Sequence, residues 1–207
     1  MSQKLRALSL FAGYGGLTLA VEEHLGAELV AYSEFDPAPS KVMEAHWPGV
    51  PNLGDITRID WAAVKSEYGP IHIVDGGSPC QDLSAAGKRA GMTEGTRSNL
   101  WVNMREAIAI LQPEYVMWEN VRGAYSARAV SEADSEMEQQ SRLLGGGGDR
   151  PALRALGRVL GDLHDLGFDA EWRGIRASDV GAPHQRFRVF VLATRRNASN
   201  TSSIGRE

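Results

Sequence analysis

Short apolar runs alternate along the chain with longer segments in which apolar residues recur every three or four positions. The short runs have the length of buried strands, and the longer segments have the spacing of helices that bury one face. This alternation predicts an α/β domain with a parallel sheet and helices on both of its faces. The predicted strands are 5–10, 29–33, 71–74 and 115–118, and the predicted helices are 17–25, 37–46 and 99–111.

The alternation breaks at about 124–151, where the chain is polar and acid-rich and contains four consecutive glycines. Such a segment contributes little to a core, so we interpret it as a flexible insertion: a solvated linker on composition alone, or a clamp or partner-binding loop. A helix at 153–166 follows, and two strands at 168–175 and 187–194 are predicted to pair antiparallel. The expected organisation is one catalytic domain over 1–194 and a polar tail over 195–207.

The composition limits the classes of protein that fit. The chain has 207 residues and a single cysteine, so it cannot hold an internal disulfide and suits a reducing compartment. No run approaches the roughly 20 apolar residues of a membrane span, and the N-terminus is predicted to be a strand, not a signal peptide. We therefore expect a cytoplasmic protein that does not engage a membrane. The net charge of −4 argues against an indiscriminate nucleic-acid binder, although basic residues cluster after the cysteine and in the last third.

The single cysteine lies in a loop that follows a predicted strand. Cys80 comes after Pro79, and the strand at 71–74 ends shortly before them. Loops at the carboxyl ends of strands carry the reactive groups in open α/β sheets, and the proline ring stiffens this turn. A lone cysteine is more often a small buried apolar residue, so the alternative of a nucleophile depends on the rest of the chain.

A glycine-rich turn follows the first strand. The sequence FAGYGG at 11–16 lets the backbone approach a ligand closely, and Glu34 ends the second strand 21 residues after Gly13. An acidic residue at that distance holds a ribose in Rossmann-like sites. The spacing of the glycines within the turn, however, is neither that of a dinucleotide-binding fingerprint nor that of a phosphate-binding loop. The pair predicts a nucleoside cofactor without a pyrophosphate. A tight turn beside a solvated acid is the competing interpretation.

Taken together, these segments resemble the cytosine-C5 DNA methyltransferase family, which uses S-adenosyl-L-methionine. The resemblance implies a Rossmann-like, class I methyltransferase fold: a mostly parallel sheet with flanking helices and a terminal antiparallel strand. It also implies DNA methylation, as in restriction–modification systems. The motifs are FAGYGG (11–16), YSEFD (32–36), GDIT (54–57), SPCQDLSAAGKRAG (78–91), RSNLW (97–101), ENV (119–121) and QRFRVFVLA (185–193).

The resemblance assigns catalytic roles to particular residues. Cys80 would add to carbon 6 of cytosine as a thiolate, and Glu119 would protonate or hydrogen-bond N3 of the base. Arg188, and with less support Arg186, would contact the base or its phosphate. The target cytosine would have to be flipped out of double-stranded DNA. The other expected contacts are Phe11, Gly13, Gly15, Glu34, Phe35, Asp55, Ile56, Pro79 and Leu100 to the cofactor, and Gln81 and Ser84 to DNA; no metal is expected.

The sequence departs from the family pattern after QRFRVFVLA. The family continues there with a target-recognition region and further motifs, and this chain has only a short polar tail. We therefore expect the catalytic part of a truncated or split enzyme; in a split enzyme, a separate target-recognition subunit would complete it. Two alternatives remain: the tRNA-methylating branch of the same family, and a non-catalytic remnant that binds a cofactor or a partner.

Overall fold

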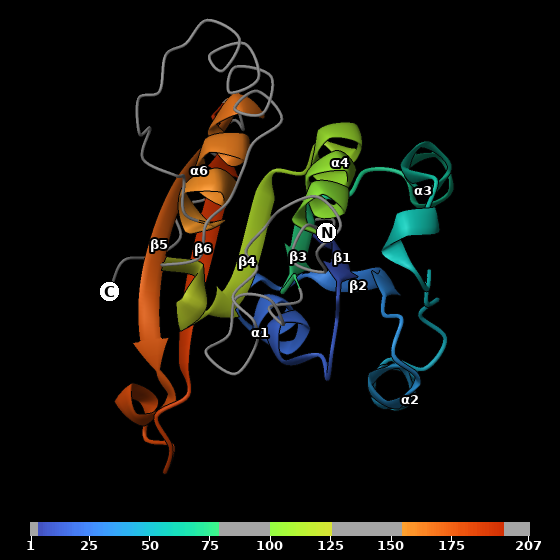
Figure 1. The fold of residues 1–207 in the computed structure, drawn as a ribbon. Helices are drawn as coiled ribbons and strands as arrows, with labels where there is room; N and C mark the ends of the chain where they lie inside the picture. Colours follow the sequence, from blue (N-terminus) through green and yellow to red (C-terminus); the bar gives the residue numbers. More distant parts are fainter. Residues whose placement is uncertain (1–3, 79–99, 126–154, 197–207) are drawn as a thin grey trace, which may run out of the picture.

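The computed structural model describes residues 4–78, 100–125 and 155–196, and within these ranges the chain forms a six-stranded sheet. The spatial order is β2-β1-β3-β4-β6-β5 (Figure 1). β1, β2, β3 and β4 are parallel, and β6 runs antiparallel to both of its neighbours, β4 and β5. The strands are β1 (Arg6–Leu10), β2 (Glu28–Ser33), β3 (Ile73–Gly76), β4 (Tyr115–Val121), β5 (Phe168–Arg176) and β6 (Phe187–Arg195).

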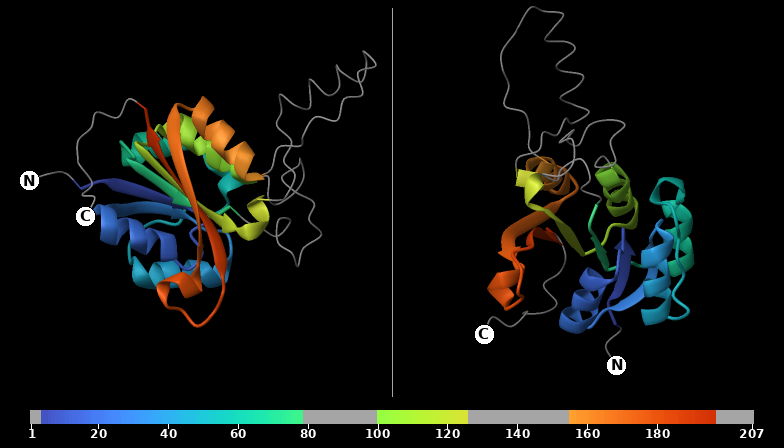
Figure 2. Two further views of the ribbon diagram at one scale, coloured as in Figure 1. Left: turned by 90° about the vertical axis from the view of Figure 1, so that its left-hand side faces the viewer. Right: turned by 60° about the horizontal axis from the view of Figure 1, so that its bottom comes forward.

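Helices cover the sheet on both faces. α3, α4 and α6 lie on one side, and α1 and α2 lie on the other (Figure 2). The helices are α1 (Gly16–Leu25), α2 (Pro37–His46), α3 (Trp61–Tyr68), α4 (Trp101–Leu111) and α6 (Ala155–Asp165), with short 3-10 turns η1 (Ile56–Arg58), η3 (Arg122–Tyr125) and η4 (Ala177–Val180).

The largest apolar cluster fills the layer between the sheet and α3, α4 and α6. Trp101 of α4 and Trp118 of β4 meet edge to face there, with ring centroids 6.1 Å apart. Asp162 of α6 accepts hydrogen bonds from the Trp101 indole and from Arg158, each at 2.7 Å. These partners allow a carboxylate to be buried, because a buried charge is tolerated when it is paired and hydrogen-bonded. The cluster thereby joins α4 to α6 beneath the strands that carry the site.

The fold class predicted from the sequence is confirmed: the sheet is mostly parallel, and its last strand in sequence is antiparallel. This strand is not at the edge, because β6 lies between β4 and β5. β4 continues to Val121, three residues beyond its predicted end, since it pairs with β6 as far as Arg188. β6 ends at Arg195, whose guanidinium lies 4.5 Å from the centroid of the Phe168 ring.

Two further features were not predicted. α3 begins after Asp60, which caps it by accepting the amides of Ala62 and Ala63, and it buries Trp61 and Val64. Its eight residues offer too few apolar positions for a helical pattern to stand out. Ordered structure also continues through η3 to Tyr125, past the predicted start of the insertion at about 124. Most of the insertion (126–151) and most of the polar tail (197–207) lie outside the described residues.

In the part of the chain that the structure describes, no helix has the length and apolarity needed to cross a membrane.

Candidate active site

Five of the predicted site residues come together at one edge of the sheet: Phe11, Gly13, Glu119, Arg186 and Arg188. The carboxyl ends of β1, β2, β3 and β4 point to this edge, and β6 starts there because it runs in the opposite direction. A pocket of about 610 Å³ opens at this edge, a size typical of small-molecule sites. Its walls are the glycine turn and α1, the ends of β3 and β4, and the β5–β6 hairpin. Lining residues include Phe11, Gly13, Tyr14, Gly16, Leu17, Gly77, Glu119, Ile175, Arg176, Val180, Arg186, Arg188 and Phe190.

The glycine turn is held by the acidic residue predicted to accompany it. Glu34 accepts the Gly13 amide on Oε2 at 2.7 Å and the Asp36 amide on Oε1 at 2.8 Å. Gly13 has a φ of 55°, which glycine adopts without the penalty of a side chain. Each carboxylate oxygen has a second lone pair, so Glu34 can still accept hydrogen bonds from a ligand. The structure therefore gives Glu34 an anchoring role at the turn, and its contact with a ribose stays a prediction.

The two glycines predicted at the cofactor have different surroundings. Gly13 lines the pocket, and a Cβ on it would have only the Phe11 carbonyl oxygen within 4 Å. A Cβ on Gly15 would lie 2.4 Å from the Trp47 ring and 2.9 Å from the Met43 sulfur. The Trp47 indole is fixed from its other end because it donates to Glu22 at 2.8 Å. Gly15 thus permits close packing of the turn against the segment that follows α2.

Glu119 forms an ion pair with Arg188 in the same pocket. Arg188 Nε lies 2.6 Å from Glu119 Oε1, and the side chains are 21% and 28% exposed, respectively. The register explains the pairing: Glu119 is opposite Phe190 and Val121 is opposite Arg188, so the two charged side chains are diagonal neighbours on one face. A carboxylate oriented by an arginine, and still partly open to the pocket, is suited to binding a planar polar ligand.

The chain leading to Cys80 runs directly beside this ion pair. A Cβ on Gly77 would lie 2.9 Å from Glu119 Oε2, so only glycine leaves the carboxylate where it is. Ser78 is buried and its hydroxyl accepts the Trp118 indole N–H at 3.1 Å. Asn120 donates from Nδ2 to the Ser78 carbonyl at 3.2 Å. β4 therefore fixes the last two described residues before the Pro79–Cys80 dipeptide.

A buried carboxyl group lies one strand further into the sheet. Asp75 of β3 is fully buried, and it accepts the Ser9 hydroxyl at 2.7 Å, which in turn accepts the Thr18 hydroxyl at 2.9 Å. Its Oδ2 has no hydrogen-bond partner among the residues that the structure describes. Burial raises the pKa of Asp75 to about 7, with the hydrogen bond from Ser9 opposing the rise and the charge of Glu22 adding to it.

The remaining predicted residues fall into two groups. The first group is described but does not line this pocket: Phe35 is 78% exposed, Ile56 is buried, and Leu100 packs against the core. Asp55 belongs to it as well; the Thr57 amide and hydroxyl donate to its carboxylate, and these bonds, the amide first, lower its pKa. Pro79, Cys80, Gln81 and Ser84 form the second group and lie outside the described residues.

Two residues that support the site were not found from the sequence. Trp47 packs on Gly15, as described above. Asn52 accepts the amides of Glu34 and Gly54 on Oδ1 and donates to the Glu34 carbonyl from Nδ2. It therefore ties the end of β2 to the GDIT segment. The only sequence signal for Asn52 is its position two residues before that motif.

Among the described residues, no group of three histidine, cysteine or acidic side chains could hold a metal ion.

Comparison with known proteins identifies the family of this chain. The family model described as C-5 cytosine-specific DNA methylase matches residues 5–206. The type II methyltransferase M.HgiBI of Herpetosiphon aurantiacus is 32% identical over 194 residues, covering 92% of this chain and 37% of its own length. M.HpaII of Haemophilus parainfluenzae is 31% identical over 193 residues, covering 93% of this chain and 46% of its own length. The chain thus spans less than half the length of these relatives.

Solved structures share the fold. The crystal structure of the S. pombe Dnmt2 methyltransferase matches with a TM-score of 0.63 over 93% of this chain and 51% of that one. The sequence identity is 18%, so this likeness concerns the arrangement of strands and helices alone.

Proposed function

Because this chain belongs to the C-5 cytosine-specific DNA methylase family, we propose that it is the catalytic part of an enzyme that methylates carbon 5 of cytosine in DNA, with S-adenosyl-L-methionine as methyl donor. The observation that carries the proposal is the Glu119–Arg188 ion pair in one pocket with the glycine turn. A carboxylate and a guanidinium can hold a base by its polar edge, and the turn lies opposite them. Family membership supplies the chemistry that this geometry would serve.

The proposed reaction begins at Cys80. Its thiolate adds to carbon 6 of the flipped base, and the electron pair of the carbon 5–carbon 6 double bond moves into the ring as N3 takes the proton that Glu119 gains when the base binds. The resulting enamine makes carbon 5 nucleophilic. After carbon 5 has gained the methyl group, a base removes the proton of carbon 5, the carbon–sulfur bond breaks, and its electron pair returns to the thiolate. N3 gives its proton back to Glu119. Arg188 orients Glu119 throughout, since it is bonded to one oxygen of that carboxylate.

The glycine turn fits the cofactor that the family uses. Gly13 presents backbone with open space beside it, and Glu34 keeps lone pairs free for the hydroxyls of a ribose. Phe35, next to Glu34, leaves an aromatic side chain exposed near the same strand end. When bound, S-adenosyl-L-methionine supplies an electrophilic methyl group on a sulfonium. The role of this chain is then to hold the nucleoside at Glu34 and the methyl group near the pocket.

We also propose that DNA recognition requires more than these 207 residues. The chain covers 37% and 46% of the two relatives, so a reader of DNA sequence would belong to another part of the protein or to a separate subunit. Double-stranded DNA with a flipped cytosine is the proposed substrate, because a paired base cannot reach a pocket at the edge of the sheet.

The full chain should be tested with DNA that contains 5-fluorocytosine, together with S-adenosyl-L-methionine and a target-recognition fragment supplied in trans. Fluorine at carbon 5 cannot leave as the proton does, so the reaction stops at the covalent adduct. We expect a denaturation-resistant complex whose modified peptide contains Cys80, the only cysteine of the chain. The Cys80→Ser variant should give none. An adduct that persists in Cys80→Ser, or an adduct formed only with tRNA, would contradict the proposed function.

A further inference from the structure

Arginines of this protein differ in whether a carboxylate neutralises them. Within the described ranges, five have a carboxylate oxygen within 4 Å: Arg58, Arg105, Arg158, Arg188 and Arg196. Arg122, Arg176 and Arg186 are exposed and have no such partner among the described residues. The nearest acidic residue in the chain to Arg176 is Asp179, which accepts the Arg176 backbone amide. These three cations therefore retain their capacity to bind an anion.

Strand register brings Arg122 and Arg176 to either side of Phe187, and Arg186 directly precedes Phe187 in the chain. Arg176 at the end of β5 is opposite Phe187 at the start of β6. Val121 at the end of β4 is opposite Arg188, and Arg122 is the next residue along. The guanidinium carbons of Arg122 and Arg176 lie 5.9 Å and 5.8 Å from the centroid of the Phe187 ring. We call Arg122, Arg176 and Arg186 the arginine row.

The phenyl ring of Phe187 holds two like charges in place. Each cation is attracted to the face of the aromatic ring, whereas the two guanidinium groups repel one another. An anion bound beside them would relieve this repulsion and would find the side chains already oriented. Guanidinium groups suit phosphate oxygens because their N–H donors form a planar fork.

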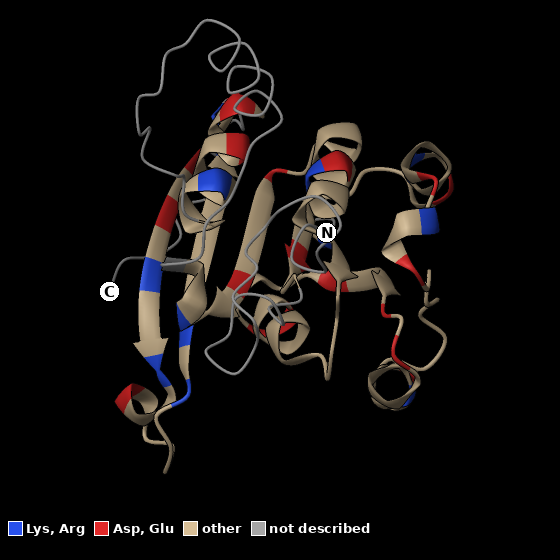
Figure 3. Ribbon diagram, in the orientation of Figure 1, with Lys and Arg blue, Asp and Glu red and all other residues tan. Residues whose placement is uncertain are grey.

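The arginine row lies at the mouth of the candidate active site. Arg176 and Arg186 line the pocket together with Glu119, and Arg122 follows Glu119 by three residues. Figure 3 shows basic positions on this end of β5 and β6, although the chain as a whole has a net charge of −4. An anionic polymer would thus be attracted to this end of the sheet in particular.

We infer that the arginine row, supported by Phe187, binds the phosphate backbone of the nucleic-acid strand whose cytosine enters the pocket. This inference rests on the proposed function for the identity of the polymer. The row holds the backbone at the ends of β4, β5 and β6, while Glu119 and Arg188 face the base. Phosphate contacts of this kind position a strand without reading its sequence.

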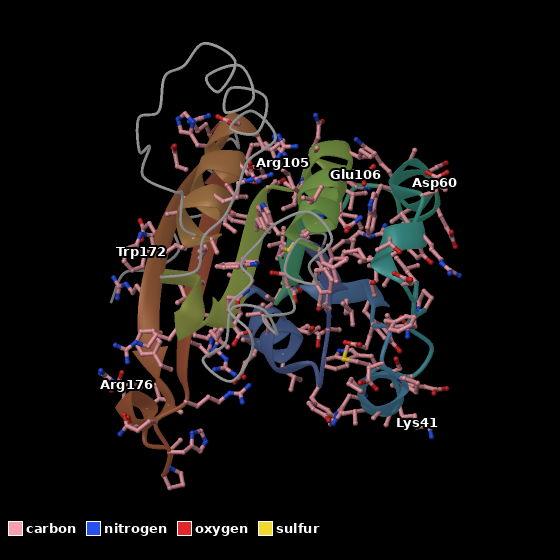
Figure 4. All side chains as sticks on the ribbon, in the orientation of Figure 1. Lys41, Asp60, Arg105, Glu106, Trp172 and Arg176 are labelled. Carbon is pink, nitrogen blue, oxygen red and sulfur yellow. The ribbon has the colours of Figure 1, made fainter. Side chains whose placement is uncertain are left out.

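The test is the salt dependence of DNA binding by the full chain, measured by fluorescence anisotropy with a labelled cytosine-containing duplex from about 25 to about 200 mM salt. The slope of log affinity against log salt should become shallower by about 0.9 for each lost phosphate contact in Arg122→Gln and Arg176→Gln. Lys41→Gln is the matched control, because it removes one exposed charge from α2, far from Arg176 (Figure 4). Phe187→Leu should weaken DNA binding with little change in the salt slope, because it removes the aromatic ring that supports the arginines but removes no charge.

The outcomes separate this inference from the proposed function. Slopes equal to that of the wild type in both arginine variants, or no binding by the wild type at about 25 mM salt, would overturn the arginine row. Shallower slopes without a 5-fluorocytosine adduct would keep the row and reject the chemistry. An adduct with unchanged slopes would keep the proposed chemistry and reject the arginine row.

Discussion

Gly77 and Glu119 are packed so closely that a Cβ on Gly77 would lie 2.9 Å from Oε2 of the carboxylate and 3.4 Å from the Glu119 carbonyl oxygen. The neighbouring Gly76 is equally confined, but by different atoms: its Cβ would lie 2.5 Å from the Leu10 carbonyl oxygen. One glycine therefore borders a functional side chain and the other borders the backbone of β1.

Alanine at these adjacent positions should have different effects. In Gly77→Ala the end of the Glu119 side chain can move, so we expect a small loss of stability and a roughly hundredfold slower formation of the Cys80 adduct, the cost typical of a misplacement of about 1 Å. In Gly76→Ala the backbone of β1 cannot yield without breaking its pairing with β3, so the free energy of unfolding should fall by about 1–3 kcal/mol. Thermal denaturation and adduct kinetics measure the two effects. Equal loss of stability in both variants would contradict the distinction.

The two glycines at the start of α1 provide a second comparison. Gly15→Ala should lower the free energy of unfolding by more than about 2 kcal/mol, because its φ of 79° disfavours a side chain and Trp47 occupies the space. Gly16→Ala should leave stability unchanged or slightly raised, since nothing lies within 4 Å and alanine favours a helix. Urea denaturation of both variants is the measurement. A stable Gly15→Ala variant would show that the packing of Trp47 on the turn is not required.

Cofactor affinity should depend on Glu34. Glu34→Ala removes the acceptor of the Gly13 amide and the proposed acceptor of the ribose, so S-adenosyl-L-methionine should bind with about 1.5–3 kcal/mol less free energy. Isothermal titration calorimetry measures this loss, and Glu23→Ala, which removes an exposed acid from α1, is the control. Equal affinities of the wild type and Glu34→Ala would refute the role of Glu34.

Stability should depend on pH through Asp75. The pKa of Asp75 is raised from 3.8 to about 7 in the folded protein, so the folded state keeps a proton that the unfolded chain releases. The stabilisation from this group is complete below pH 3.8, declines as the pH rises, and is lost above about 7. Asp75→Asn cannot titrate, so the melting temperature of the variant relative to the wild type should rise between about pH 5 and about pH 7.5. Parallel pH profiles of the two proteins would contradict the burial of an uncharged Asp75.

Prediction from sequence succeeded where local patterns determine structure. Apolar runs and helical spacing located the strands and helices outside α3, and the separation of Gly13 from Glu34 anticipated that they would act together. The sequence did not distinguish Gly15 from Gly13, because the difference depends on Trp47, which is 32 residues further along. It also ended β4 too early, since Glu119 and Asn120 are polar and belong to the strand only because β6 pairs with them.

The position of β6 has a consequence for synthesis on the ribosome. The strand separates β5 from β4, so β5 has no neighbour in the sheet until residues 187–195 have left the exit tunnel. Glu119 is likewise synthesised 69 residues before its partner Arg188, an interval of about 3–14 s at about 5–20 residues per second. The nascent chain therefore completes its sheet and the Glu119–Arg188 ion pair in a single late event, and no shorter intermediate of translation holds the assembled pocket.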